Sequence, residues 1–70
     1  MNQLTRREQE IAALVATGAS NKQIAYHLAI SEKTVKNTLT RVFVKTATQS
    51  RTQLAVRWVQ ASAQFIPSLG

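Results

Sequence analysis

Four patterns that begin α-helices divide this chain, and they constrain its fold more than any other feature. In three of them a hydroxyl residue precedes Glu or Gln by three positions: Thr5 and Glu8, Ser20 and Gln23, Ser50 and Gln53. Each pair can form a capping box, in which the hydroxyl accepts a bond from the backbone and the Glu or Gln side chain returns one. Ser31 is a fourth N-cap, with Thr34 as a weaker partner. Together they predict helices over about residues 6–17, 21–28, 32–46 and 51–63.

Apolar residues recur at helical spacing in these segments. Ile11, Leu14 and Val15 form one face of the first helix, as Ile24 and Leu28 do in the second. No stretch alternates with a period of two, so the expected fold class is all-α. A chain of 70 residues is long enough for one small core. We therefore expect a compact four-helix domain over about residues 1–64, followed by a short tail, 65–70.

The second and third helices are expected to form a helix-turn-helix. The second has only about eight residues, and Ala29-Ile30-Ser31 links it to a longer, more charged helix. Such a link is too short for antiparallel packing, so the two helices must cross steeply. This crossing presents the N-terminal part of helix 32–46 outward.

The charge is strongly one-sided. Residues 1–32 hold three basic and three acidic side chains, so the whole net charge of +6 lies in residues 33–70, which contain no acid. A basic surface of this kind favours a polyanion, either a nucleic acid or an anionic membrane.

The same composition argues against several other classes. Three glutamates, one histidine and no cysteine leave no pair of carboxylates, nucleophile with its base, or metal cluster, so we expect no enzyme, no metal and no cofactor. The longest apolar run, residues 11–16, is too short to span a bilayer, and no signal peptide is visible. A cytoplasmic protein is expected.

The outward face of helix 32–46 carries the candidate binding residues. On a helical wheel Val35, Leu39, Val42, Phe43 and Thr46 form the core face. The opposite arc carries types that can contact bases in a major groove, namely Lys33, Lys36, Asn37 and Thr40. The cap and flank carry types suited to phosphates, namely Ser31, Thr34, Arg41 and Lys45.

Helix 51–63 has a wider apolar arc than packing on a small core requires. Leu54 and Trp58 cluster towards the core, while a further apolar set extends the arc: Ala55, Val56, Val59 and Ala63. This excess predicts a second buried contact, and a two-fold dimer is the commonest. At the start of this helix, Arg51 has two open interpretations, an internal bond to a nearby helix end or a DNA contact.

Three blocks of sequence closely resemble the LuxR/GerE-type DNA-binding domain, the C-terminal effector domain of the LuxR/NarL/FixJ regulators. They are LTRREQEI from Leu4, GASNKQIA from Gly18 and ISEKTVKN from Ile30, and the match continues through SRTQLA from Ser50. The resemblance implies a bacterial transcription regulator that binds double-stranded DNA as a homodimer through helix 32–46. It implies base-facing roles for Lys36, Asn37 and Thr40. It also implies that four further residues lie near phosphates: Lys22, Ser31, Lys33 and Thr34. Thr38, Thr46 and Thr48 depart from the family pattern.

Two other functions remain open. A sigma-factor region-4-like domain shares the LTxRE opening and would contact RNA polymerase as well as promoter DNA. Against it, helix 32–46 is not rich in arginine. A protein-interaction module could instead use the apolar arc of helix 51–63 and bind no nucleic acid.

Overall fold

The computed structural model describes residues 3–63, and side-chain burial over residues 3–61. It contains four helices: α1 (Arg6–Ala16), α2 (Asn21–Leu28), α3 (Glu32–Thr46) and α4 (Arg51–Ala63). No strand occurs within this range, so the all-α prediction is confirmed. The one difference in bounds is that α1 ends at Ala16, one residue earlier than expected, and Thr17 is its C-cap residue. The expected tail, 65–70, lies outside the described residues.

The helices begin where their caps predict. The Glu8 amide donates to Thr5 Oγ1 at 3.2 Å while the Thr5 amide donates to Glu8 Oε1 at 2.8 Å. Ser20 and Gln23 form the same reciprocal pair. The box expected at Ser50 is only half formed, because Gln53 Oε1 accepts from the amide of Gln49, one residue earlier, at 2.8 Å.

The first three helices are each terminated by a residue whose backbone is in the left-handed conformation. These residues are Gly18 (φ 90°), Ala29 (φ 57°) and Ala47 (φ 54°). At each, the following amide bonds back to a carbonyl five residues earlier, as Thr48 does to Phe43 at 3.0 Å. Alanine in this conformation costs about 1–2 kcal/mol. Although no glycine or asparagine follows α3, the helix thus reaches its full expected length.

Two buried threonines, Thr46 and Thr48, close the end of α3. Thr46 Oγ1 donates to the Val42 carbonyl at 2.7 Å and lies 2.9 Å from Thr48 Oγ1. Because the Thr46 proton is used by the carbonyl, Thr48 must be the donor in the second bond. The two hydroxyls therefore satisfy each other within the apolar end of the helix.

We expect this pair to show strong non-additivity on substitution. Thr46→Val removes the acceptor of Thr48 and is expected to cost about 1–3 kcal/mol of unfolding free energy. The double variant Thr46→Val/Thr48→Val replaces both partners by groups of the same shape, so its stability should return close to that of the parent. Urea unfolding of the parent, the two single variants and the double variant measures this coupling. Additive losses of unfolding free energy would contradict the pairing.

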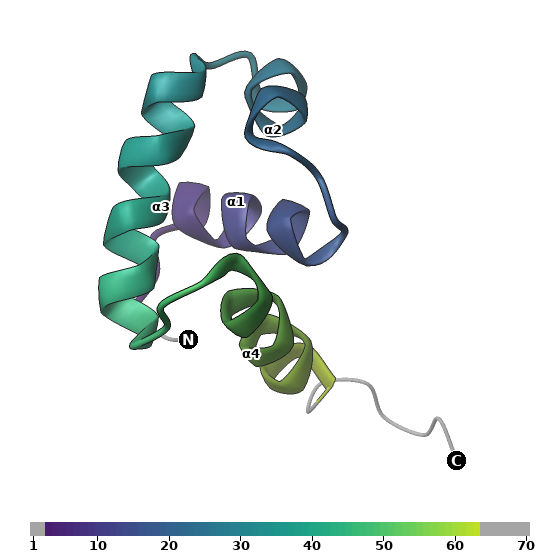
Figure 1. The fold of residues 1–70 in the computed structure, drawn as a ribbon, viewed down its shortest axis with the longest axis vertical. Coiled ribbons are helices and arrows are strands. Elements are labelled where there is room, and N and C mark those ends of the chain that lie inside the picture. The colour runs from purple at the N-terminus through teal and green to yellow at the C-terminus, as the bar shows by residue number, and fades with distance from the viewer. Residues whose placement is uncertain (1–2, 64–70) are drawn as a thin grey trace.

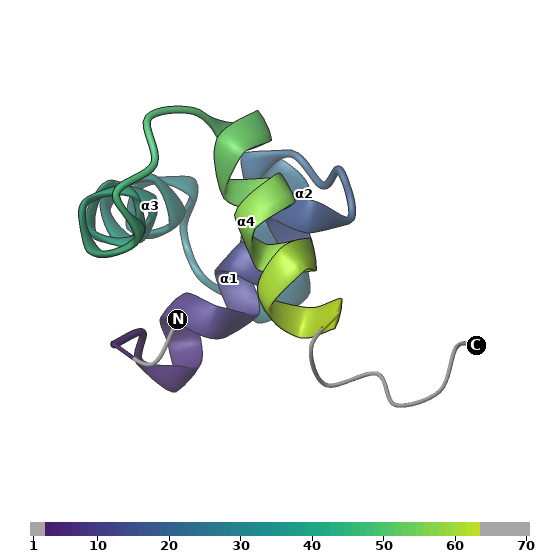
Figure 2. The ribbon, with the colours of Figure 1, turned by 90° about the horizontal axis from the view of Figure 1, so that it is seen from below.

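The helices surround a core to which all four contribute. Its fully or nearly fully buried apolar residues are Leu4, Ile11, Ala12, Val15, Ile24, Ala25, Val35, Leu39, Val42 and Leu54. Figure 1 shows α1 running across the middle of α3, with α2 near the N-terminal end of α3 and α4 on the opposite side of α1 from α2. Seen along α3 in Figure 2, α4 lies over α1, its main packing partner.

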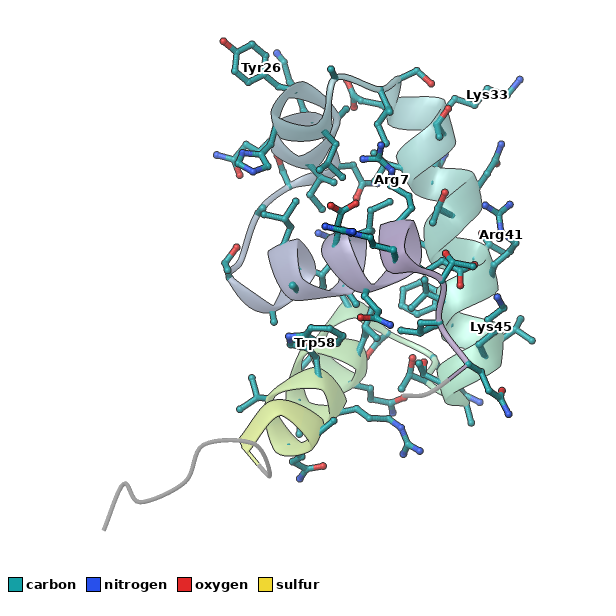
Figure 3. All side chains as sticks on the ribbon, turned by 180° about the vertical axis from the view of Figure 1, so that it is seen from behind. Arg7, Tyr26, Lys33, Arg41, Lys45 and Trp58 are labelled. Atoms are coloured by element: carbon teal, nitrogen blue, oxygen red, sulfur yellow. The ribbon has the colours of Figure 1, made fainter. Side chains whose placement is uncertain are left out.

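The core face expected for α3 is largely confirmed. Val35, Leu39 and Val42 are buried, and Phe43 is partly buried against the core. Thr38, which the wheel left off this face, is also buried. Trp58 of α4 packs against the core from the side and lies between α4 and α1 in Figure 3. With its inner face held at these points, α3 has a fixed rotation and its opposite face stays in solvent.

Candidate nucleic-acid interface

One concave surface collects the polar residues of the helix-turn-helix. We call it the recognition surface, and its lining is Asn21, Glu32, Lys33, Lys36, Asn37 and Thr40. All four residues predicted to contact bases are therefore brought together in one place. The helical wheel did not place Asn21 or Glu32 with them. Asn21 is the first residue of α2, so its position here depends on how α2 crosses α3.

The chemistry of this surface is mainly that of hydrogen-bond donors and positive charge. Lys33, Lys36 and Asn37 are exposed, as is Glu32 in the first turn of α3. The Thr40 hydroxyl donates to the Lys36 carbonyl at 3.1 Å, so its oxygen and methyl group are what it offers to a ligand. Ammonium and amide groups suit the acceptor edges of guanine and adenine, and a threonine methyl group suits thymine.

Apart from Lys33, the residues expected near phosphates do not line the recognition surface. Ser31 Oγ accepts from the Thr34 amide at 3.0 Å and is bonded to Thr34 Oγ1 at 2.9 Å, so both side chains already serve the cap of α3. They are nevertheless exposed at the N-terminal end of that helix, where backbone amides favour anions. Lys22 is exposed on α2. Figure 3 shows that Lys33 is near this end of α3, whereas Arg41 and Lys45 are farther along it.

Arg41 and Lys45 bind within the domain instead of lining the recognition surface. Lys45 Nζ lies 2.8 and 3.1 Å from the two carboxylate oxygens of Glu8 on α1, and Arg41 Nε lies 3.5 Å from Glu8 Oε2. Arg41 also donates to Thr38 Oγ1 at 3.3 Å. The Lys45 side chain is only 33% exposed. A phosphate contact by Lys45 stays a prediction, and it would compete with this ion pair.

Glu8 therefore has two tasks, since the same carboxylate caps α1 and holds α3. It is buried, and its pKa is lowered to about 2 by the hydrogen bond from Lys45 and by that from the Thr5 amide. The sequence signalled only the cap. Nothing local indicated the partner, because Lys45 lies 37 residues away along the chain.

The lowered pKa predicts how stability depends on pH. Because the folded-state pKa lies below the ordinary value of 4.5, the Glu8 carboxylate stabilises the fold fully above about pH 5 and loses this effect as the pH falls towards 2. We expect the stability difference between the parent and Glu8→Gln to shrink over that interval. Chemical unfolding at a series of pH values measures it. Glu10→Gln, which removes an exposed carboxylate from the same helix, is the control, and equal pH dependence in both variants would contradict the assignment.

The α4 surface leaves apolar residues in solvent. Val56 and Val59 are 50% and 55% exposed, and Ala55 beside them is partly buried. The side chain of Ala63, the fourth residue of the expected dimer interface, lies outside the described residues. Tyr26 on α2 is 90% exposed and points away from the domain in Figure 3, at a distance from this surface.

The described residues form neither a metal-binding cluster nor a membrane span. Over residues 3–61 no group of three or more histidine, cysteine, aspartate or glutamate side chains is placed to hold a metal ion. None of the helices in the described part of the chain has the length and apolar character needed to cross a membrane.

A short helix, a tight left-handed turn and a longer helix with a polar, basic outer face define a helix-turn-helix domain of the kind that nucleic-acid-binding proteins use. Residues 2–58 match the family model described as bacterial regulatory proteins of the LuxR family. The chain belongs to this family, as its sequence resemblance implied.

Named relatives agree with this membership. The monoamine regulon transcriptional regulator of Klebsiella aerogenes is 48% identical over 64 residues, which are 90% of this chain and 28% of that protein. The CsgBAC operon transcriptional regulatory protein of Escherichia coli is 53% identical over 55 residues, 79% of this chain and 25% of that protein. The nitrate/nitrite response regulator protein NarL of E. coli is 43% identical over 65 residues, which are 93% of this chain and 30% of that protein.

The first two relatives are transcriptional regulators by name and the third is a response regulator by name, and none of the three is named as an enzyme. The chain spans only 25–30% of their lengths. Their names therefore describe whole proteins of which the matched region is a part.

Proposed function

We propose that this chain binds double-stranded DNA sequence-specifically and thereby regulates transcription, with α3 in the major groove. The observation that carries the proposal is the recognition surface, where two lysines, an asparagine and a threonine line one concavity on the outer face of a helix. Lys36 and Asn37 are proposed to read base edges, with Thr40 and Lys33 beside them. Lys22, Ser31 and Thr34 are proposed to contact phosphates at the entrance of the groove.

Selection of bound sequences from a pool of random duplex DNA tests this function. We expect a short consensus, and a palindromic one if two copies bind together. A salt titration on the selected duplex should give a log–log slope of about −0.9 for each phosphate neutralised. Equal binding to all duplexes would contradict sequence-specific recognition, and no binding at low salt would contradict DNA binding altogether.

We further propose that the protein acts as a homodimer through α4. The support is the exposure of Val56 and Val59 on one side of a helix whose other side is buried against α1. Contact with RNA polymerase stays a prediction.

Val56→Glu is expected to weaken dimerisation while leaving the monomer folded, because it places an unpaired charge in an apolar contact. A penalty of about 1.4 kcal/mol already raises the dissociation constant of the dimer ten-fold. Sedimentation equilibrium measures the mass, on the free protein and on the selected duplex. Arg6→Gln makes the same change in net charge at an exposed position of α1 and should leave the mass unchanged. If Val56→Glu also leaves it unchanged, α4 is not the interface.

A further inference from the structure

Arg51 bridges α4 and the start of α2. Its Nη1 donates to Asn21 Oδ1 at 2.6 Å and its Nη2 donates to the Ala19 carbonyl at 2.6 Å. These bonds join residues 30 and 32 positions apart and are partly buried. Of the two interpretations open for Arg51, the structure therefore shows the internal bond, at the segment that leads into α2.

The bridge determines which end of the Asn21 amide is free. A guanidinium group has only donors, so it must meet the oxygen of the asparagine side chain and not its nitrogen. Among the hydrogen bonds of the described residues, none uses Asn21 Nδ2 as a donor. Two N–H groups are therefore left over on a side chain that lines the recognition surface.

Resting on the proposed function, we propose that Asn21 is a further DNA contact, which donates Nδ2–H to a phosphate oxygen, and that Arg51 is the positioning residue that orients it. A phosphate fits this location better than a base. Asn21 opens α2, where the helix dipole and the backbone amides favour an anion. Lys22 stands next to it, whereas the residues proposed to read bases all belong to α3.

Because Asn21 is neutral, replacing it should change the affinity for DNA without changing the salt dependence of binding, unlike replacing a lysine. A hydrogen bond to a charged oxygen is worth a roughly ten-fold change in affinity, so Asn21→Ala should bind about ten-fold more weakly, equally on the selected duplex and on a duplex of unrelated sequence. It releases no counterion, so the salt slope should stay that of the parent. Lys22→Ala, by contrast, should reduce the slope by about one.

A charge-matched pair separates the N–H donor from general electrostatics. Asn21→Asp keeps an acceptor for Arg51 but offers no N–H group to DNA. Gln23→Glu adds the same charge two residues later, and Glu can replace Gln23 in the capping box with Ser20. We expect Asn21→Asp to bind DNA about ten-fold more weakly than Gln23→Glu, which reflects one lost charged hydrogen bond. Equal binding by the two would overturn the donor role.

The positioning role of Arg51 is tested by a double-mutant cycle. Arg51→Lys keeps the charge but loses the planar fork that reaches both acceptors. It should weaken DNA binding in the parent and have no further effect in an Asn21→Ala background. Arg57→Lys on the same helix should bind like the parent. Affinities are compared at a temperature at which circular dichroism shows every variant folded, so that a loss of stability cannot imitate a loss of contact.

Each outcome separates the claims. If the parent binds DNA and Asn21→Ala binds equally well, or loses affinity on one sequence only, the phosphate contact is wrong while the proposed function stands. If the effects of Asn21→Ala and Arg51→Lys are additive, Arg51 does not act through Asn21. If the parent itself binds no DNA, the proposed function fails and this inference with it.

Discussion

Leu54→Ala is expected to destabilise the domain by about 2–5 kcal/mol, because it opens a cavity in a core that is small to begin with. Leu54 is fully buried, and it is the only side chain of α4 in the fully or nearly fully buried core of the described residues. A domain of this size has a stability near the low end of about 5–15 kcal/mol. The variant should therefore be largely unfolded at temperatures where the parent is folded.

Urea unfolding followed by circular dichroism measures this effect. Val44→Ala is the control, since it shortens a valine that is 77% exposed and lies outside the proposed dimer contact, and it should change stability by no more than about 0.5 kcal/mol. If Leu54→Ala and Val44→Ala have similar unfolding midpoints, α4 is not held on the domain through Leu54.

The second large effect concerns DNA recognition. Lys36→Ala is expected to cost about 1–3 kcal/mol in binding to the selected duplex and to relax the preference at one base position. The physical reason is that the Lys36 ammonium lies on the recognition surface next to Asn37 and can donate to guanine O6 and N7.

Repeating the selection with the variant shows which position loses its preference. Lys22→Ala is the comparison, because a lysine that contacts only phosphate should weaken binding to all sequences alike. If Lys36→Ala gives the same uniform loss, Lys36 is a phosphate contact and α3 reads the bases through other residues.

Much of the recognition surface could be predicted because a helix converts spacing along the chain into direction. Val35, Leu39 and Val42 share one face of α3, so Lys33, Lys36, Asn37 and Thr40 had to share the other. Thr38 was harder to place. It lies next to Leu39 at the edge of the buried face, and its hydroxyl accepts a bond from Arg41 that makes burial tolerable.

The flank of α3 shows what helical spacing leaves out. Arg41 and Lys45 have the charge of phosphate contacts, and their spacing gave no other indication. In the fold they turn to Glu8, whose carboxylate is buried where α1 meets α3. A buried carboxylate needs a partner, and these cations provide it. Part of the positive charge in the second half of the chain is therefore neutralised inside the domain.

The four helices, their starting points and the outer face of α3 can all be derived from local sequence. Caps act over three or four residues and helical faces repeat over similar distances, so both are local properties of the chain. The pairing of Lys45 with Glu8 and of Arg51 with Asn21 joins residues 37 and 30 positions apart, and no local pattern indicates it. Such pairs depend on how the helices cross, and the crossing is set by the packing of the whole core.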